Sequence, residues 1–242
     1  MVKASVIIPA LNEEKLIEDV LAQFTDEDIK KYNLELIVSD GGSSDKTLEK
    51  VKNYACNVIE HKEKVKQNIS QGRNNGASIS RGDVLIFFNA DTRISDKKKF
   101  FERIFEVLKD DKIAAIACPI FVFPEEEKMF DKVFHTFYNN YVIMLNKFFM
   151  GMGRGECHIV RRELYEKVAG YDEKLFAGED FDLYKRLRKH GKIHFMKDIP
   201  IYESPRRYRK FGYTRVVYDW LKNSIWVTLF HKSSSSEWEA VR

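Results

Sequence analysis

Strands and helices are predicted to alternate over the first 120 residues, and this alternation constrains the fold more than any other feature. Short β-rich apolar runs occupy residues 4–10, 34–40, 56–61 and 84–89. Segments with helical apolar spacing or helix-start signals separate them, over residues 12–24, 43–55 and 70–80. Strands joined through helices by short links form a largely parallel sheet with helices on both faces. The sequence therefore predicts an α/β, Rossmann-like domain.

Composition fits a soluble protein of ordinary type. The chain has 242 residues, of which 44% are apolar and 32% are charged, enough for one large domain with a full core. The three cysteines, Cys56, Cys118 and Cys157, form no CxxC pair, which argues against a disulfide framework or zinc site and for a reducing compartment. The strand pattern starts almost at Met1, which leaves no signal peptide, and no apolar run approaches the roughly 20 residues that cross a bilayer. We therefore expect a cytoplasmic protein.

Polar residues follow three of the predicted strands, at residues 9–13, 40–45 and 89–91. Ligands of such sheets bind beyond the carboxyl ends of the strands, so these segments are expected to form one site. Asp40 can accept hydrogen bonds from a ribose or a base, and Gly42 lets the backbone pass close to a ligand. Arg73, on a helix facing the same edge, can bind phosphate or sugar hydroxyls. The alternatives are capped turns for the strand ends and a solvated helix face for Arg73.

The stretch "VLIFFNADTR", residues 84–93, is a buried strand that ends on a polar tip. An acidic residue in this position commonly presents a metal ligand, and Asp91 is the candidate here. The position two residues earlier, where such enzymes often carry a second carboxylate, is Asn89. The alternative is that Asp91 caps the helix expected to start near Ser95.

The stretch "GEDFDLYKRL" places Glu179 and Asp180 at the start of a helix, directly after Gly178. Acids in the first turn are stabilised by the helix dipole, so capping is one interpretation. Together with Asp182, however, they exceed what capping needs. A carboxylate held near an anionic cofactor can also act as a general base for a hydroxyl. Both interpretations stay open on these residues alone.

Five motifs, in this order and at these spacings, resemble the family 2 nucleotide-sugar glycosyltransferases with the GT-A fold. They are "SVIIPALNEE", "LIVSDGGSSDKT", "GRNNGA", "FFNADT" and "GEDFDLYKRLRKHG". The resemblance covers roughly residues 4–203. It implies an inverting transfer of a sugar from a UDP- or GDP-linked donor. In that reaction a base deprotonates an acceptor hydroxyl, which attacks the anomeric carbon opposite the departing nucleoside diphosphate.

The resemblance also assigns expected roles to individual residues. Pro9, Asn12 and Glu13 would line the nucleotide pocket, Asp40 would contact the base or ribose, and Arg73 would approach the diphosphate. Asp180 would be the general base, with Glu179 beside it.

The expected cofactor is Mg²⁺ or Mn²⁺, which offsets the charge that develops on the leaving diphosphate. By resemblance Asp91 is the metal-binding Asp of the DxD motif. Asn89 replaces the first Asp of that motif, so it can contact the ribose but is not a second metal ligand. Such ions often take only one or two protein ligands, the rest being phosphates and water. The basic segment "SPRRYRKFGY", with Arg206 and Arg207, is predicted to be a flexible lid over the diphosphate; the alternative is a solvated basic loop.

The chain is expected to divide into three parts, with the acceptor left open. Residues 1–120 form a nucleotide-sugar-binding half, residues 121–205 an acceptor-binding half of the same GT-A domain, and residues 206–242 a basic loop with a C-terminal amphipathic helix. Aromatic-rich helices near 130–150 and 211–230 favour either a peripheral contact with the inner face of the membrane, which suits a lipid-linked acceptor, or packing on the core or in a homodimer.

Other function classes fit the sequence less well. A sugar-nucleotide pyrophosphorylase needs a Gly- and Arg-rich signature where this chain has "PALNEE", and a nicotinamide dehydrogenase needs GxGxxG after the first strand. A nucleic-acid-binding module would leave the acidic motifs unexplained, so no nucleic-acid partner is expected. A catalytically inactive sugar-nucleotide-binding protein stays an alternative because of Asn89.

Overall fold

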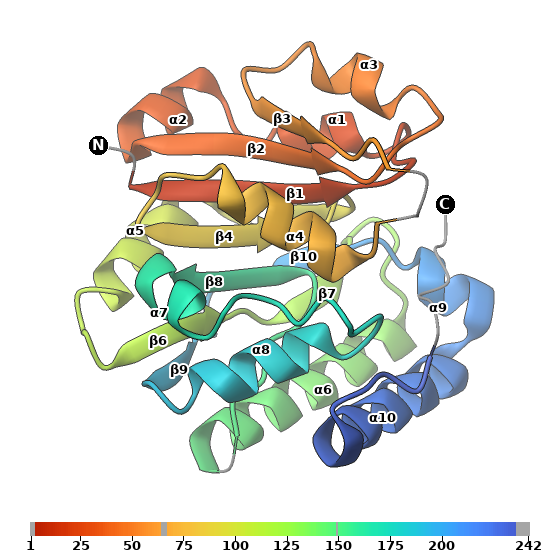
Figure 1. The fold of residues 1–242 in the computed structure, drawn as a ribbon. Helices are drawn as coiled ribbons and strands as arrows, with labels where there is room; N and C mark the ends of the chain where they lie inside the picture. Colours follow the sequence, from red (N-terminus) through yellow and green to blue (C-terminus); the bar gives the residue numbers. More distant parts are fainter. Residues whose placement is uncertain (1–2, 64–66, 149, 236–242) are drawn as a thin grey trace.

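The computed structural model describes residues 3–63, 67–148 and 150–235, so the end of the predicted C-terminal extension lies outside the described residues. Its main sheet contains seven strands in the order β3-β2-β1-β4-β8-β6-β9, and a smaller sheet has the order β5-β10-β7 (Figure 1). The strands are β1 (Ala4–Ala10), β2 (Leu34–Asp40), β3 (Asn57–Glu60), β4 (Val84–Phe88), β5 (Thr92–Ile94), β6 (Ile113–Ala117), β7 (Ile120–Val122), β8 (Cys157–Arg161), β9 (Lys192–Phe195) and β10 (Ile201–Glu203).

The main sheet is parallel except at one strand. β1 pairs in parallel with both β2 and β4, and β6 pairs in parallel with β9. β8 runs antiparallel between β4 and β6. All residues of β1, β2 and β4 are buried, as expected for central strands covered on both faces. The predicted α/β class with a largely parallel sheet is confirmed.

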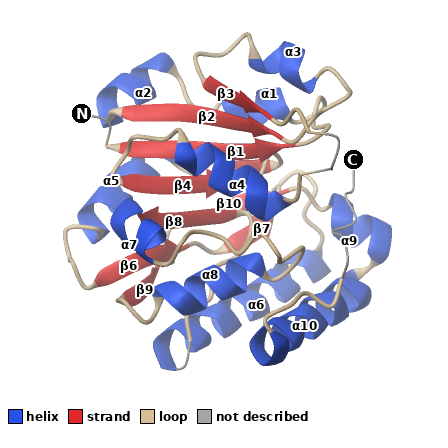
Figure 2. Ribbon diagram, in the orientation of Figure 1, coloured by secondary structure: helices blue, strands red, loops and turns tan. Residues whose placement is uncertain are grey.

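Helices cover both faces of this sheet (Figure 2). The described helices are α1 (Ile17–Leu21), α2 (Asp26–Tyr32), α3 (Thr47–Val51), α4 (Ile69–Ser78), α5 (Lys97–Val107), α6 (Met129–Phe148), α7 (Arg162–Lys167), α8 (Glu179–Leu187), α9 (Arg206–Phe211) and α10 (Tyr213–Phe230). Side chains alternate between two cores because successive strand residues point to opposite faces. Val6 and Ile8 of β1 pack with α1 and α5, whereas Ile7 packs in the core that contains Leu183 and Leu187 of α8.

The glycines of "GRNNGA" let α4 approach the sheet closely. A Cβ at Gly76 would lie 2.4 Å from Cγ2 of Ile7, and a Cβ at Gly72 would lie 3.3 Å from Cβ of Pro9. The motif therefore has a packing role, and it brings Arg73 to the carboxyl end of β1.

Several boundaries differ from the predictions. The helix predicted over residues 12–24 is shorter than expected, because α1 covers only Ile17–Leu21. A separate helix, α2, follows a capping box at Thr25 that the apolar spacing did not reveal. The helix predicted over residues 43–55 is reduced to α3, Thr47–Val51. The basic loop predicted from residue 206 is also wrong, because residues 206–211 form α9.

Two long helices, α6 and α10, lie with α8 beyond the β9 side of the main sheet (Figure 1). Part of α6 is buried, with Val142 fully covered, but Phe137 and Phe148 are exposed. The helix α6 therefore has one packed face, as an amphipathic helix should, but its opposite face also carries exposed apolar side chains. None of the helices that the structure describes has the length and apolar character to span a membrane.

Candidate active site

A cavity of about 630 Å³ lies at the carboxyl ends of β1 and β4 and is also lined by the start of α8 and by α9. This volume is within the range of sites that hold nucleotide-sized ligands. Most of the sequence-predicted site residues line it: Pro9, Glu13, Arg73, Asn89, Asp91, Glu179, Asp180, Arg206 and Arg207. Asn12, Asp40 and Gly42 do not line it, although Ser39 and Gly41 do.

Asn12, Asp40 and Gly42 shape the loops beneath the cavity. Asn12 has a left-handed backbone with φ of 54°, and its side-chain oxygen accepts a hydrogen bond from the Ser44 N–H at 2.8 Å. Asp40 Oδ2 accepts hydrogen bonds from the N–H groups of Gly42 and Ser43, each at 2.9 Å. The other oxygen of Asp40 is buried and receives no hydrogen bond from the residues the structure describes. Buried acceptors normally receive a hydrogen bond, so this oxygen is available to a donor group of a ligand.

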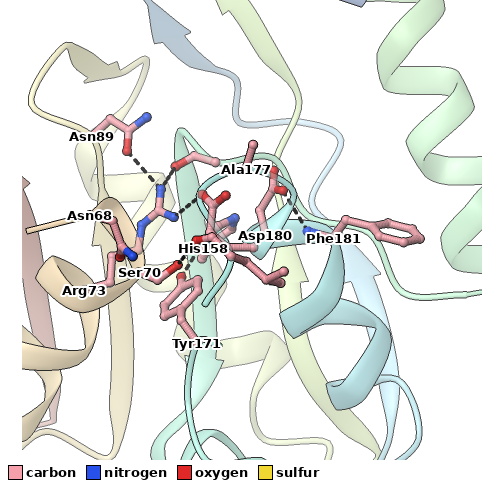
Figure 3. A network of polar contacts seen from close by, with 12 residues as sticks. Asn68, Ser70, Arg73, Asn89, His158, Tyr171, Ala177, Asp180 and Phe181 are labelled. Carbon is pink, nitrogen blue, oxygen red and sulfur yellow. Dashed lines mark hydrogen bonds and ion pairs between the residues drawn. The ribbon is translucent and has the colours of Figure 1, made fainter. Parts of the chain in front are cut away.

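Arg73 is the centre of a buried polar network (Figure 3). Its side chain is 2% exposed and forms a 2.7 Å ion pair with Oε1 of Glu179. It also donates to the Gly155 carbonyl at 2.8 Å and to the amide oxygen of Asn89 at 3.1 Å, and it lies 5.1 Å from the centre of the Tyr171 ring. The solvated helix face considered for Arg73 is therefore wrong. Arg73 connects the tip of β4 to the first turn of α8.

Asp180 lies beside this network, at the rim of the cavity. Its Oδ1 accepts a 2.7 Å hydrogen bond from the N–H of Phe181 (Figure 3). Gly155 is close to Oδ2, because a Cβ at that glycine would lie 3.7 Å from this oxygen. Burial, followed by the charge of the adjacent Glu179, raises the pKa of Asp180 to about 7. A carboxylate with such a pKa is well matched to proton transfer near neutral pH.

Asp91 belongs to a second group of charged residues, which also contains Glu13 and Arg206. Arg206 donates to both oxygens of Glu13, each at 3.0 Å, and lies 3.1 Å from Oδ2 of Asp91. Burial raises the pKa of Asp91, and the nearby charges of Glu13 and Glu156 raise it further while Arg206 opposes them. The helix-cap alternative for Asp91 is wrong, because α5 is capped by Asp96, whose side chain accepts from the Lys99 N–H at 3.0 Å.

The donor set around Asp91 fits a hard divalent cation that brings its own ligands. Among the described residues no group of three or more His, Cys, Asp or Glu side chains is arranged to hold a metal. Asp91 and Glu13, which share Arg206 as their counter-charge, offer carboxylate oxygens of the type that Mg²⁺ and Mn²⁺ prefer. A cation here would therefore need phosphate or water oxygens to complete its coordination.

A third charged cluster was not predicted. Arg154, 4% exposed, lies 2.9 Å from Oε1 of Glu203 and 3.5 Å from Oε2 of Glu156, and its guanidinium lies 5.1 Å from the Tyr138 ring centre. Burial raises the pKa of Glu203 well above its usual range, as does the charge of Glu156. The stretch "GMGRGE" contained two of these residues, but Tyr138 and Glu203 come from distant segments, so no local pattern joins them.

The comparisons with known proteins agree with this geometry. Residues 5–169 match the family model described as glycosyl transferase family 2. "Probable glycosyltransferase YdaM" of Bacillus subtilis is 28% identical over 205 residues, which cover 78% of this chain and 47% of that protein. The chain thus spans about half the length of this curated relative.

Solved structures share the fold at low sequence identity. A mannosyltransferase from Pyrobaculum calidifontis, in complex with GDP-Man and Mn²⁺, has a TM-score of 0.72 at 20% identity, over 92% of this chain and 61% of that one. Glucosyl-3-phosphoglycerate synthase from Mycobacterium tuberculosis, in complex with Mn²⁺, UDP and phosphoglyceric acid, has a TM-score of 0.61 at 18% identity, over 94% and 77% of the two chains. These likenesses show the GT-A fold. The family match over residues 5–169, which is more than half of the chain, shows that the chain belongs to glycosyl transferase family 2.

Proposed function

We propose that this chain catalyses inverting transfer of a sugar from a UDP- or GDP-linked donor to an acceptor hydroxyl or lipid phosphate, with Asp180 as general base. The observation that carries the proposal is the pair of carboxylates in one cavity. Asp180, with a pKa raised to about 7, lies at one part of the rim, and Asp91 lies at the tip of β4. Asp180 is suited to take a proton from the acceptor, and Asp91 is suited to hold a cation that binds the donor diphosphate.

Residues of β1 and β2 are assigned to the nucleotide. Pro9 and Glu13 line the cavity, as do Ser39 and Gly41 on either side of Asp40 in the sequence, and one oxygen of Asp40 is buried without a hydrogen-bond partner among the described residues. A ribose hydroxyl or a base N–H would satisfy that oxygen, provided that the loop around Gly42 opens to it. Asn12 is assigned an indirect role, because it ties the loop after β1 to the loop after β2.

Asp91 and Glu13 are the residues that would hold Mg²⁺ or Mn²⁺ together with the donor phosphates. When bound, such an ion offsets the negative charge that develops on the leaving diphosphate. In the structure, the positive charge between Glu13 and Asp91 comes from Arg206, which forms ion pairs with both carboxylates. We infer that donor binding moves Arg206 and Arg207 of α9 toward the diphosphate, so that α9 serves as the basic lid and excludes water from the site.

Arg73 holds the base in place rather than binding phosphate directly. Its guanidinium already bonds to Glu179, Asn89 and the Gly155 carbonyl. The charge of Glu179, which this ion pair holds next to Asp180, helps to raise the pKa of Asp180. Asn89, a neutral acceptor for Arg73, links the base to the strand tip that carries Asp91.

The first test is stabilisation by donor nucleotides. UDP-, GDP- and dTDP-sugars are screened by thermal unfolding with and without Mn²⁺. A matching donor at 100 times its Kd stabilises the fold by about 2.7 kcal/mol, which raises the Tm of a domain of this size by about 5–10 °C. We expect one nucleotide class to do this and Mn²⁺ to enlarge the shift. In Asp91→Asn the additional Tm shift caused by Mn²⁺ should disappear, whereas the Tm shift caused by the donor without Mn²⁺ should remain. If no nucleotide sugar stabilises the protein, the proposed function is wrong.

The second test is the pH dependence of donor turnover. The base must be ionised, and burial raises the pKa of Asp180 to about 7. We therefore expect kcat/KM to be low in acid and to rise as the pH increases through about 7, because this parameter reports the free enzyme. In Glu179→Gln the rise should move to lower pH, since a like charge is lost and Arg73 is left unpaired nearby. An unchanged profile in this variant would contradict the assignment of the titration to Asp180.

A further inference from the structure

A second cavity, about 340 Å³, lies between α6, α10 and the start of α8. Among the described residues that line it there is no Asp, Glu, Lys, Arg or His. The lining residues with hydroxyl groups are Tyr138, Tyr141, Ser224 and Thr228, and the Thr228 hydroxyl donates to the Ser224 carbonyl of its own helix at 2.7 Å. The cavity therefore offers apolar and aromatic surface, in contrast to the charged active-site cavity.

The two cavities adjoin each other. Met152, Phe181 and Trp220 are among the side chains that line both. Phe181 directly follows Asp180, and the carboxylate of Asp180 accepts its N–H. Phe181 therefore lies between the reacting end of a ligand at Asp180 and the apolar surroundings of the second cavity.

The second cavity is elongated along α10. Its lining on α10 reaches from Val217 to Leu229, and twelve steps of an α-helix span about 18 Å of helix axis. At the far end it meets the side chain of Leu229, which is 66% exposed, and next to Trp220 it is lined by Leu221, which is 53% exposed. An elongated apolar cavity without charged groups is a poor match for a sugar or a base and a good match for a hydrocarbon chain.

The surroundings of the far end also favour a chain that continues outward. Within the described residues, large exposed apolar side chains gather on α6 and α10 and at Phe176, while Val58 and Ile79 are the two found elsewhere. Apolar surface gathered in this way marks contact with a partner or a lipid phase. Because the cavity opens among these side chains, a bound chain would have apolar surface along its whole path.

We propose that this cavity binds the hydrocarbon chain of an amphiphilic acceptor whose polar head carries the nucleophile to Asp180. The inference rests on the proposed function and specifies its acceptor class. The chain lies between α6 and α10, and the head reaches the charged cavity past Phe181. Burial of each additional methylene group strengthens binding by about fourfold until the cavity is filled.

The test uses two fluorescent amphiphiles, dansyl-aminohexanoic acid and dansyl-aminoundecanoic acid, below their micelle concentrations. The longer chain is expected to bind tighter by tenfold or more. Leu221→Asp, which places a charge in the cavity wall, should remove this chain-length dependence. Tyr218→Asp is the matched control, because Tyr218 is on the same helix, is 63% exposed and does not line the cavity. It should keep the dependence.

Three results would overturn the proposal. They are equal affinity for both probes, equal losses in Leu221→Asp and Tyr218→Asp, and a stable dimer that excludes the probes and dissociates in Leu221→Asp. Equal losses would indicate a broad apolar face rather than a chain-binding cavity. Donor stabilisation by nucleotide sugar with Mn²⁺ is measured on the same variants and should be unchanged. If no donor stabilises the protein but the probes bind with the expected chain-length dependence, the proposed function is rejected. If a donor stabilises the protein but the probes show no chain-length dependence, only the acceptor class is rejected.

Discussion

Asp180→Asn is expected to lower donor turnover by about 10²- to 10⁴-fold while leaving donor binding intact. The amide keeps the size of the side chain but cannot take the acceptor proton. The polar contact with the Phe181 N–H can persist through the amide oxygen, so the first turn of α8 should keep its shape. Turnover is measured as release of nucleoside diphosphate from the donor that stabilises the protein, and binding as the donor-dependent shift in Tm.

The matched control for this variant is Asp182→Asn. Asp182 is on the same helix and forms a 2.6 Å ion pair with Arg186, but it does not line the active-site cavity. Its replacement removes a carboxylate of the same motif without touching the site, so turnover should stay within a few-fold of the wild type. If Asp180→Asn retains full turnover, another group is the base. If both variants lose turnover alike, the effect arises from α8 and not from proton transfer.

Arg73→Met is expected to destabilise the protein by about 3–5 kcal/mol, the cost of leaving one partner of a buried ion pair without its counter-charge. The Arg73 side chain is 2% exposed and that of Glu179 is 11% exposed, so water compensates little for the lost pairing. The Gly155 carbonyl and the Asn89 amide oxygen would lose a donor as well. The free energy of unfolding is measured by urea titration, with the slope m checked for a change in the unfolding transition.

Two further variants separate the buried pair from a general loss of charge. Arg73→Met combined with Glu179→Gln removes both charges, so it should be more stable than Arg73→Met alone. Arg103→Met breaks an exposed ion pair with Glu106 on α5 and should leave the urea midpoint unchanged, because exposed pairs contribute little. A double variant less stable than Arg73→Met would show that the network is held by interactions other than this ion pair.

Much of the nucleotide-side architecture was predictable because it depends on local signals. Buried strands with β-rich apolar runs, such as β1, β2 and β4, were found close to their predicted bounds. The capping box at Thr25 is equally local, yet it was missed because the helix that follows has few apolar residues. The three-stranded sheet of β5, β7 and β10 was not predictable, because its strands are only three residues long and gain their stability from pairing.

The sequence by itself determined the α/β class and the gathering of Asp91 and the β1 residues at one edge of the sheet, because parallel strands present their carboxyl ends together. Only the tertiary structure decided how the charges pair. Arg73 meets Glu179 across 106 positions of sequence, and Arg206 meets Glu13 across 193. It also decided that the apolar cavity between α6 and α10 adjoins the active-site cavity. Local periodicity specifies which face of an element is apolar, but the partner of a buried charge or an apolar face depends on the packing of distant segments.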